Sequence, residues 1–373
     1  MNMKKIKILF LSDAHSIHTV KWAKFLVSNG YFDIHIFSLT AVEDYVFKDT
    51  GIIVHNPYSP SINKNKSGPE KLKYLFALPS LKKVIKQFNP HIIHAHYATS
   101  YGLLGALTAF KPFVISAWGS DIYLFPHKSI FHKFILKYNF KKASRIISTS
   151  KDMALEIKKY TSKNIDLTPF GVETDFFKPC NCGSLFNDDA VVIGTVKSLE
   201  PVYGIEYLIK AFSVLKHKNS EINLKLLIVG QGSLKDDLLK LCEDLHLKND
   251  VTFTGFINHN ELVKYYNMLD VFVALSLSES FGVAVLEAAS CGKPSVVSNV
   301  GGLTEVVENN VTGFIVPPKK VEEAAHAIEK LVLNKELRKK MGAQAREFVQ
   351  EKYNWYNNAQ KIIQIYSSLV PDK

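Results

Sequence analysis

The chain has few cysteines and no long apolar run. Four cysteines among 373 residues are too few for a disulfide framework in a chain of this length. Cys180 and Cys182 are too close in sequence for an easy bridge, and no second pair or histidine set has zinc spacing. No stretch approaches the roughly 20 apolar residues of a membrane span. The start runs directly into a strand, without the long apolar core of a signal peptide. We therefore expect a reduced, cytoplasmic protein.

The first predicted βα unit lacks the signature of a nicotinamide-binding enzyme. The loop after the first strand, Ser12–Thr19, contains no glycine-rich fingerprint. The second strand ends at Leu39 without the acidic residue that would hold a ribose. Both absences argue against a dehydrogenase.

The net positive charge comes from the first half of the chain. The net charge is +11, but residues 1–170 hold 24 Lys and Arg against 10 Asp and Glu, whereas residues 171–373 hold 22 against 25. This asymmetry indicates an anionic partner for the first half. Nucleic acid would also explain the charge, but no binding motif and no base-stacking platform accompanies the basic residues.

Two series of alternating strands and helices follow from the apolar pattern, which predicts an α/β protein with parallel sheets. The first series has strands at 5–11, 33–39, 90–96, 112–117 and 145–149. The second has strands at 190–196, 225–229, 251–254, 271–275, 294–298 and 313–316, and helices at 320–333, 335–350 and 355–370 follow it. The polar segment 59–71 is expected to be a surface loop. Two prolines and a glycine in Leu167–Pro179 indicate a linker between two domains.

One stretch combines an anion site with two acids. The strand 271–275 is followed by a tight turn, Ser278–Gly282, and then by an apolar helix from Val283. A helix start offers unpaired N–H groups and partial positive charge, which suit phosphate. Glu279 lies in the turn and Glu287 about two turns into the helix. Because a carboxylate beside phosphate favours a hydroxyl partner, the pattern describes a sugar nucleotide. The alternative is a capped helix whose acids only complement its dipole, which suits Glu287 less well, since apolar residues surround it.

The spacing Glu279 to Glu287 is an E-x7-E motif, and the chain resembles the family-4 retaining glycosyltransferases. The other matching segments are Ile8–Asp13, Trp118–Asp121, Pro169–Pro179, Val229–Gly232, Val251–Phe256, Gly292–Gly302 and Gly313–Pro317. The resemblance implies the GT-B fold, in which two Rossmann-like, doubly wound domains face each other across a cleft. We expect domains at 1–172 and 190–354, a linker at 173–189, and a helix at 355–373 that packs back on the first domain. It further implies a nucleotide-sugar donor and no essential metal or other cofactor.

The same resemblance assigns roles to the donor side. Glu287 would bind the ribose hydroxyls, and Glu279 would hold hydroxyls of the donor sugar near the reacting carbon. The region of Gly255 and Phe256 would receive the base. The backbone of the turn and helix start would contact sugar and diphosphate, at Ser280, Phe281, Gly282 and Val283.

The chain departs from the family where cations usually face the diphosphate. Family members carry Gly-Arg-Leu-x3-Lys-Gly, and Ser198 and Tyr203 stand at the Arg and Lys positions. Lys197 is then the remaining cation for the diphosphate, and Lys197 and Glu279 are the predicted catalytic residues, unless a contribution comes from His15, His18 or Lys21.

The acceptor-side candidates lie at strand ends of the first domain. They are His18, His96, Trp118 and Asp121. Trp118 stands where many relatives have His, and is either a sugar-binding or a core aromatic. Asp121, like Asp13, is either a hydroxyl contact or a turn cap. His94 and His96 share a strand face, but no carboxylate or Cys accompanies them as a metal site.

The predicted helix 129–143 mixes aromatic residues with lysines. It is either an amphipathic helix that covers the sheet or a helix that binds an anionic membrane surface. The basic first half suits a lipid-linked or otherwise anionic acceptor.

These observations together predict a glycosyltransferase. It would move a hexose-type sugar from a nucleoside diphosphate to a hydroxyl of a glycan or lipid-linked acceptor, with retention, in the synthesis of surface polysaccharide, lipopolysaccharide or another glycoconjugate. It would be cytoplasmic or peripheral on the inner membrane face. The alternatives are a non-catalytic GT-B partner protein and a nucleotide-sugar epimerase.

Overall fold

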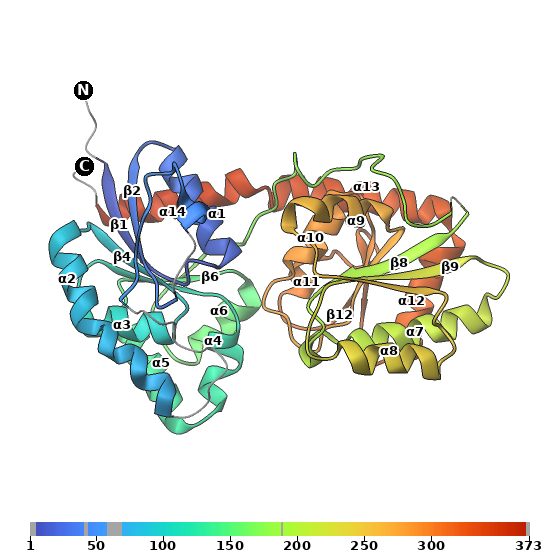
Figure 1. The fold of residues 1–373 in the computed structure, drawn as a ribbon, viewed down its shortest axis with the longest axis horizontal. Coiled ribbons are helices and arrows are strands. Elements are labelled where there is room, and N and C mark those ends of the chain that lie inside the picture. Colours follow the sequence, from blue (N-terminus) through green and yellow to red (C-terminus); the bar gives the residue numbers. More distant parts are fainter. Residues whose placement is uncertain (1–4, 41–43, 58–68, 188, 371–373) are drawn as a thin grey trace. The chain divides into compact units, whose positions relative to one another are not determined.

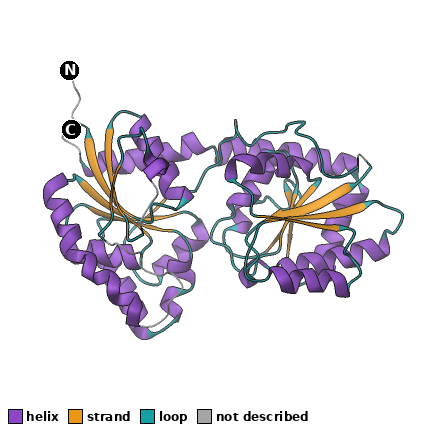
Figure 2. Cartoon of the chain, in the orientation of Figure 1, coloured by secondary structure: helices purple, strands orange, loops and turns teal. Residues whose placement is uncertain are grey.

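The computed structural model describes residues 5–40, 44–57, 69–187 and 189–370 (Figure 1). The chain forms two compact units, one built from the residues up to Thr168 and from Ala359 onward, the other from Pro169–Asn358. In each unit helices cover both faces of a central sheet (Figure 2). The predicted α/β class with parallel sheets is confirmed.

The first unit contains a seven-stranded parallel sheet in the order β3-β2-β1-β4-β5-β6-β7. Since β1 lies between β2 and β4, the winding direction reverses there, and open sheets of this kind bind ligands at the carboxyl ends of their strands near such a point. The strands are β1 (Ile6–Leu11), β2 (Phe32–Phe37), β3 (Ile53–His55), β4 (Ile92–His96), β5 (Phe113–Ala117), β6 (Arg145–Ser148) and β7 (Ile165–Leu167). The α-helices are α1 (Ile17–Ser28), α2 (Leu78–Phe88), α3 (Ser100–Thr108), α4 (Ser120–Tyr123), α5 (Ile130–Lys142) and α6 (Lys151–Lys158), with 3-10 turns η1 (Asp44–Phe47), η2 (Pro69–Ala77) and η3 (Phe125–His127).

The helix α14 (Trp355–Leu369) completes the core of the first unit. Its side chains Ile362 and Tyr366 are buried, and the Tyr366 hydroxyl lies 2.6 Å from Nδ1 of His94 on β4. The ring of Tyr366 also meets that of Phe32 edge-on. Residues from Ala359 onward therefore belong to the first unit although they follow the whole second unit in sequence.

The second unit contains a six-stranded parallel sheet in the order β10-β9-β8-β11-β12-β13. The strands are β8 (Val191–Val196), β9 (Leu224–Val229), β10 (Val251–Gly255), β11 (Val271–Ala274), β12 (Ser295–Ser298) and β13 (Gly313–Val316). The helices are α7 (Ile205–Lys218), α8 (Lys235–Asp244), α9 (Leu262–Met268), α10 (Val283–Ser290), α11 (Leu303–Val306), α12 (Val321–Leu333) and α13 (Lys335–Lys352), with 3-10 turns η4 (Pro201–Tyr203) and η5 (His259–Glu261). Strands covered on both faces are apolar almost throughout, as Val271–Ala274 is.

Sequence and structure differ mainly at the edges of the elements. The strands β3 and β7 were not predicted, because three residues are too few to display a period. The segment before β4 is a 3-10 turn up to Ala77 and an α-helix from Leu78. Most of the predicted loop 59–71 lies outside the described residues. Within the segment Leu167–Pro179, the residues from Pro169 belong to the second unit, and Phe170, Val172 and Phe177 are buried.

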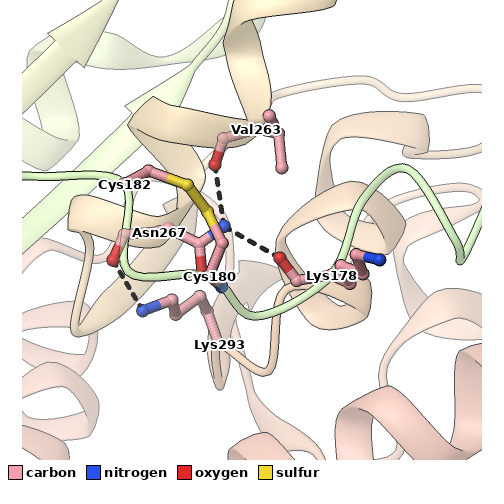
Figure 3. Close-up of a disulfide and its surroundings, with 6 residues drawn as sticks. All are labelled: Lys178, Cys180, Cys182, Val263, Asn267 and Lys293. Carbon is pink, nitrogen blue, oxygen red and sulfur yellow. Dashed lines mark hydrogen bonds between the residues drawn. A yellow bond between two sulfur atoms is a disulfide. The ribbon is translucent and has the colours of Figure 1, made fainter.

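The prediction that Cys180 and Cys182 would not form a bridge is wrong. The structure joins the two in a disulfide, with their Cα atoms 5.5 Å apart, a separation usual for disulfides (Figure 3). A residue distant in sequence shapes this loop: Asn267 accepts from the Cys180 N–H at 3.0 Å and donates to the Lys178 carbonyl at 3.0 Å. The other two cysteines, Cys242 and Cys291, are buried thiols.

None of the helices in the described part of the chain has the length and apolarity needed to cross a bilayer.

Candidate functional site

A strand-turn-helix at the carboxyl end of the second sheet forms the centre of the site. The turn follows β11 and leads into α10 at Val283. Backbone hydrogen bonds fix it to two neighbouring loops: the Leu277 N–H donates to the Val202 carbonyl at 2.8 Å, and the Gly302 N–H donates to the Glu279 carbonyl at 3.0 Å. The turn is therefore held from both sides, as a preformed ligand loop requires.

The start of α10 depends on glycine. Gly282 has φ +104° at the N-cap, a left-handed conformation that favours glycine. At Gly302 a Cβ atom would lie 2.5 Å from the Phe281 Cα, so only glycine fits there. Because Gly282 has no side chain with which to cap the helix, the first amides of α10 are left for an anion or water. The predicted helix start is where the structure has it.

The side chain of Phe281 points away from any ligand role. It is 2% exposed, and its ring packs against the rings of Phe170 and Tyr353 with centroids 6.0 and 5.7 Å apart. Only its backbone can act as predicted. Ser280 and Val283 lie beside it in the same turn and keep partial exposure.

Lys197 and Glu279 form an ion pair. Lys197 follows β8, and its Nζ contacts Oε2 of Glu279, with the two side chains 13% and 11% exposed. The same Nζ lies 4.5 Å from the ring centroid of Tyr203 on η4. Ser198, which replaces the family's arginine, is exposed. From the sequence, Lys197 was expected at the diphosphate and Glu279 at the donor sugar, and the structure places the two side chains in contact.

Glu287 is 7% exposed and has a partner that the sequence analysis missed. The Tyr266 hydroxyl donates to its Oε2 at 2.6 Å, while Nδ1 of His259 lies 4.0 Å from its Oε1. Burial, and then the neighbouring carboxylate, raise the pKa of Tyr266 well above its ordinary value, so the phenol stays protonated. The Tyr266–Glu287 contact bridges α9 and α10, and no local sequence signal announces it.

Gly255 is the last residue of β10, an edge strand of the second sheet, and Phe256 follows it. Gly255 has φ +74°, and its carbonyl accepts from the Gly230 N–H at 2.9 Å. The Phe256 side chain is 63% exposed. An exposed ring at a strand end offers a face for stacking a planar group.

In the first unit, His18, His96 and Trp118 lie together at the carboxyl ends of the strands. The Trp118 ring is 4.6 Å from the ring of His96 and 5.7 Å from that of His18, centroid to centroid. His96 is 2% exposed, and its Nδ1 is 3.1 Å from the Ser12 hydroxyl. Burial, with His94 and His18 nearby, lowers the pKa of His96 well below its ordinary value, so its imidazole is neutral. His18 and Trp118 keep part of their surface exposed.

Of the two roles that the sequence left open for Asp121, a hydroxyl contact or a turn cap, the structure supports the turn cap. It is 1% exposed, and its carboxylate accepts from the backbone N–H groups of Ala98 at 2.7 Å, Gly119 at 2.8 Å and Trp118 at 3.2 Å. It is therefore a turn-capping residue that positions the Trp118 loop. The prediction that it contacts an acceptor does not fit this burial.

His94 is engaged within the protein through both ring nitrogens, Nδ1 with the Tyr366 hydroxyl at 2.6 Å and Nε2 with the Ser116 hydroxyl at 2.8 Å. Burial lowers the pKa of His94 to about 3. Within the residues that the structure describes, no group of three or more His, Cys, Asp and Glu side chains is arranged to hold a metal ion.

Helix α5 has apolar residues on its buried side and also on its exposed side. Leu136 and Phe140 are buried, whereas Ile130, Phe131 and Phe134 are 63%, 74% and 62% exposed. The exposed lysines of the helix are Lys133, Lys137 and Lys141, and the sequence has no acidic residue between Asp121 and Asp152.

Two family patterns match the chain. The pattern described as "Glycosyl transferase 4-like" matches residues 7–150, and that described as "Glycosyl transferases group 1" matches residues 183–348. Together they include Lys197, Glu279 and Glu287 of the second unit and His18, His96 and Trp118 of the first.

Two relatives from one archaeon are named as glycosyltransferases. One uncharacterized glycosyltransferase of Methanocaldococcus jannaschii is 37% identical over 48% of this chain, a region that spans 45% of that protein. Another from the same organism is 26% identical over 90% of both chains.

The fold is similar to that of solved structures over almost the whole chain. Sucrose-phosphate synthase from Thermosynechococcus elongatus has a TM-score of 0.86 at 21% identity and covers 99% of this chain and 100% of its own. The Anabaena protein HepE, in complex with UDP-glucose, has a TM-score of 0.80 at 19% identity and covers 98% of this chain and 100% of its own.

Proposed function

The chain belongs to the glycosyltransferases, with a 4-like region followed by a group 1 region and a GT-B fold of two Rossmann-like units, and from this premise we propose its reaction. It transfers a hexose-type sugar from a nucleoside diphosphate to a hydroxyl of a glycan or lipid-linked acceptor. The observation that carries the proposal is the Lys197–Glu279 pair beside the uncapped start of α10. The UDP-glucose bound to HepE supports a donor of this class.

In this proposal the diphosphate binds at the helix start. The first amides of α10 and the macrodipole favour negative charge there. Lys197 supplies a side-chain cation for this role. As the bond from the anomeric carbon to the diphosphate breaks, negative charge grows on the leaving oxygen, and a prepositioned ammonium stabilises that charge more in the transition state than in the ground state.

The two glutamates then meet hydroxyls. Glu279 holds hydroxyls of the donor sugar, and Glu287 binds the ribose through a carboxylate whose orientation is fixed by Tyr266. The exposed ring of Phe256 stacks on the base. Lys197, the amides and the carboxylates together account for the ligand's charge and hydroxyls, so we propose that no metal is required.

We propose retention of configuration, following the family-4 resemblance. The acceptor oxygen bonds to the anomeric carbon on the face that the diphosphate leaves. The acceptor proton passes to the departing phosphate oxygen, so no protein nucleophile is needed.

The exposed side of α5 supports a membrane-associated acceptor. Covering the sheet explains the buried Leu136 and Phe140, but not the exposed Phe131 and Phe134 flanked by Lys133. Aromatic residues beside cations suit the headgroup region of an anionic bilayer. We propose that the enzyme binds the inner face of the membrane through this helix and glycosylates a surface polysaccharide, lipopolysaccharide or glycoconjugate precursor.

The test is donor turnover. UDP-, GDP- and ADP-sugars are screened by calorimetry, and release of nucleoside diphosphate is then measured with the sugar that binds. Glu279→Gln and Lys197→Met should each lower kcat by about 100-fold or more. Lys210→Met is the matched control, since Lys210 pairs with Glu206 on the exposed side of α7.

Three outcomes would contradict the proposal. Failure of every nucleotide sugar to bind, together with a cellular effect that survives Glu279→Ala, would favour a non-catalytic partner protein. Conversion of the donor sugar without release of nucleoside diphosphate would favour an epimerase. Full activity in Glu279→Gln would contradict the assignment of Glu279 to the donor-sugar site.

A further inference from the structure

The ammonium of Lys197 is held between two groups of different kind. On one side it pairs with the Glu279 carboxylate, and on the other it lies 4.5 Å from the centroid of the Tyr203 ring. With only 13% of the Lys197 side chain exposed, water contributes little to placing it. An aromatic face attracts a cation through its quadrupole, more strongly when water is excluded.

The position of the Tyr203 ring is fixed by backbone contacts. Its turn ends at Gly204, with φ +62°, where a Cβ atom would lie 2.1 Å from the Leu275 carbonyl oxygen at the end of β11. The Val202 carbonyl of the same turn accepts from Leu277. The backbone of the Tyr203 turn is thus held against the backbone that leads to Glu279.

The backbone of Lys197 is equally constrained. Its N–H donates to the Val229 carbonyl at 2.9 Å, and at Gly230 a Cβ atom would lie 1.9 Å from the Lys197 carbonyl oxygen. Only the four methylene groups of the side chain remain free to choose a rotamer. A flexible lysine loses side-chain entropy when it is held in one geometry, so a group that restricts those rotamers improves its action as a cation.

We propose that Tyr203 is a positioning residue for the transfer reaction, whose ring holds the Lys197 ammonium at the place where the donor's diphosphate meets Glu279. The inference rests on the proposed function and deepens it. It explains how a chain with Ser198 and Tyr203 in place of the family's usual Arg and Lys can use Lys197: the aromatic ring at position 203 orients the lysine at position 197.

The competing interpretation is packing, since the Tyr203 ring also lies against the apolar core of the second unit. Two substitutions separate the roles. Tyr203→Phe keeps the ring and removes only the hydroxyl, whereas Tyr203→Leu keeps an apolar side chain and removes the aromatic face. Tyr207→Leu is the matched control, because Tyr207 packs on the same core and has Lys210 5.6 Å from its ring centroid, but its lysine pairs with Glu206.

We expect the loss of UDP affinity and kcat/KM to depend on the aromatic ring at position 203 and not on the loss of stability. Tyr203→Phe should keep the wild-type kcat/KM for release of UDP from UDP-glucose, or for the donor that the screen identifies. Tyr203→Leu should lower kcat/KM and weaken binding of UDP, each by about tenfold. Tyr207→Leu should change neither, even where its Tm falls as much as that of Tyr203→Leu. Equal kcat/KM for Tyr203→Phe and Tyr203→Leu would overturn the inference.

A double-mutant cycle distinguishes failure of this inference from failure of the proposed function. If Tyr203 acts through Lys197, Tyr203→Leu should have no further effect in a Lys197→Met background. Losses that simply multiply would overturn the positioning role and leave Lys197 as the diphosphate cation. If Lys197→Met alone leaves UDP affinity and kcat/KM unchanged, the proposed function of the pair fails with it.

Discussion

The phenol of Tyr266 donates a hydrogen bond of 2.6 Å to Oε2 of Glu287, and both side chains are buried. A buried carboxylate without a donor is costly, so Tyr266 both stabilises Glu287 in the fold and sets the direction in which its other oxygen faces. That oxygen, Oε1, is on the side of the partly exposed His259.

Tyr266→Phe should therefore weaken both folding and nucleotide binding. Loss of a buried hydrogen bond to a carboxylate should lower the free energy of unfolding by about 2 kcal/mol, and a less oriented Glu287 should raise the Kd for UDP about tenfold. Urea unfolding and calorimetry measure the two. Tyr265→Phe, one residue away, should leave UDP affinity unchanged. If Tyr266→Phe lowers stability while UDP binds as before, Glu287 does not bind the ribose.

Chelation should leave the reaction intact. Since the positive charge opposite the diphosphate is proposed to come from Lys197 and the amides of α10, removal of divalent ions with EDTA should not change kcat. The measurement is release of nucleoside diphosphate before and after chelation, with added Mg²⁺ and Mn²⁺ as separate arms. Loss of activity in EDTA that Mn²⁺ restores would contradict a metal-independent reaction.

Replacement of the α5 lysines should weaken binding to anionic membranes. Each Lys near a charged bilayer contributes about 1 kcal/mol, so changing Lys133, Lys137 and Lys141 together to Gln should reduce flotation with phosphatidylglycerol vesicles by about 100-fold. Vesicles of phosphatidylcholine alone should bind neither protein well. In the control, three exposed lysines of the second unit are changed to Gln with the same loss of net charge. They are Lys240, Lys335 and Lys340. Equal flotation of both triple variants would exclude α5 as the binding surface.

Acid should destabilise the protein through His94. Because burial lowers the pKa of His94 to about 3, against about 6.5 in an unfolded chain, the side chain is neutral in both states above pH 6.5 and its contribution to stability is complete there. Between pH 6.5 and 3 the unfolded chain binds a proton that the folded protein does not, so the free energy of unfolding falls by about 1.4 kcal/mol per pH unit from this group.

His94→Gln should make this dependence less steep. Glutamine can donate to and accept from the hydroxyls of Ser116 and Tyr366 without titrating. Urea unfolding between pH 4 and pH 7 should show that the free energy of unfolding changes with pH by about one proton less than in the wild type. The pH dependence that remains comes from groups such as His96, whose pKa is also lowered by burial. A slope unchanged in His94→Gln would contradict the assignment.

The strand-turn-helix around Glu279 could be predicted because its determinants are local. An apolar run, the breakers of Ser278–Gly282 and the small residues after Val283 are adjacent in sequence, so each element follows from its own composition. The same is true of nearly all the strands covered on both faces. The strands β3 and β7 lie at the sheet edges and contain three residues each, too few for any pattern to emerge.

The contacts that define the site could not be predicted, because they join neighbours in space. Lys197 and Glu279 are 82 residues apart, and Tyr266 and Glu287 are 21 apart on different helices. Two roles stayed open for Asp121 for the same reason: spacing does not reveal whether loop amides converge on a carboxylate. The bend at Cys180 depends likewise on Asn267, 87 residues away.

Because of helix α14, the first unit is completed last during synthesis. Its residues from Ala359 onward, including the buried Ile362 and Tyr366, complete a core whose other elements all precede Pro169. The second unit is contiguous and can fold as soon as it leaves the ribosome, whereas the first must wait, with the His94 side of its sheet uncovered, until translation reaches α14. A fragment ending at Thr168 would thus present apolar surface to chaperones and to other chains, and the two halves of this enzyme cannot be separated by a single cut.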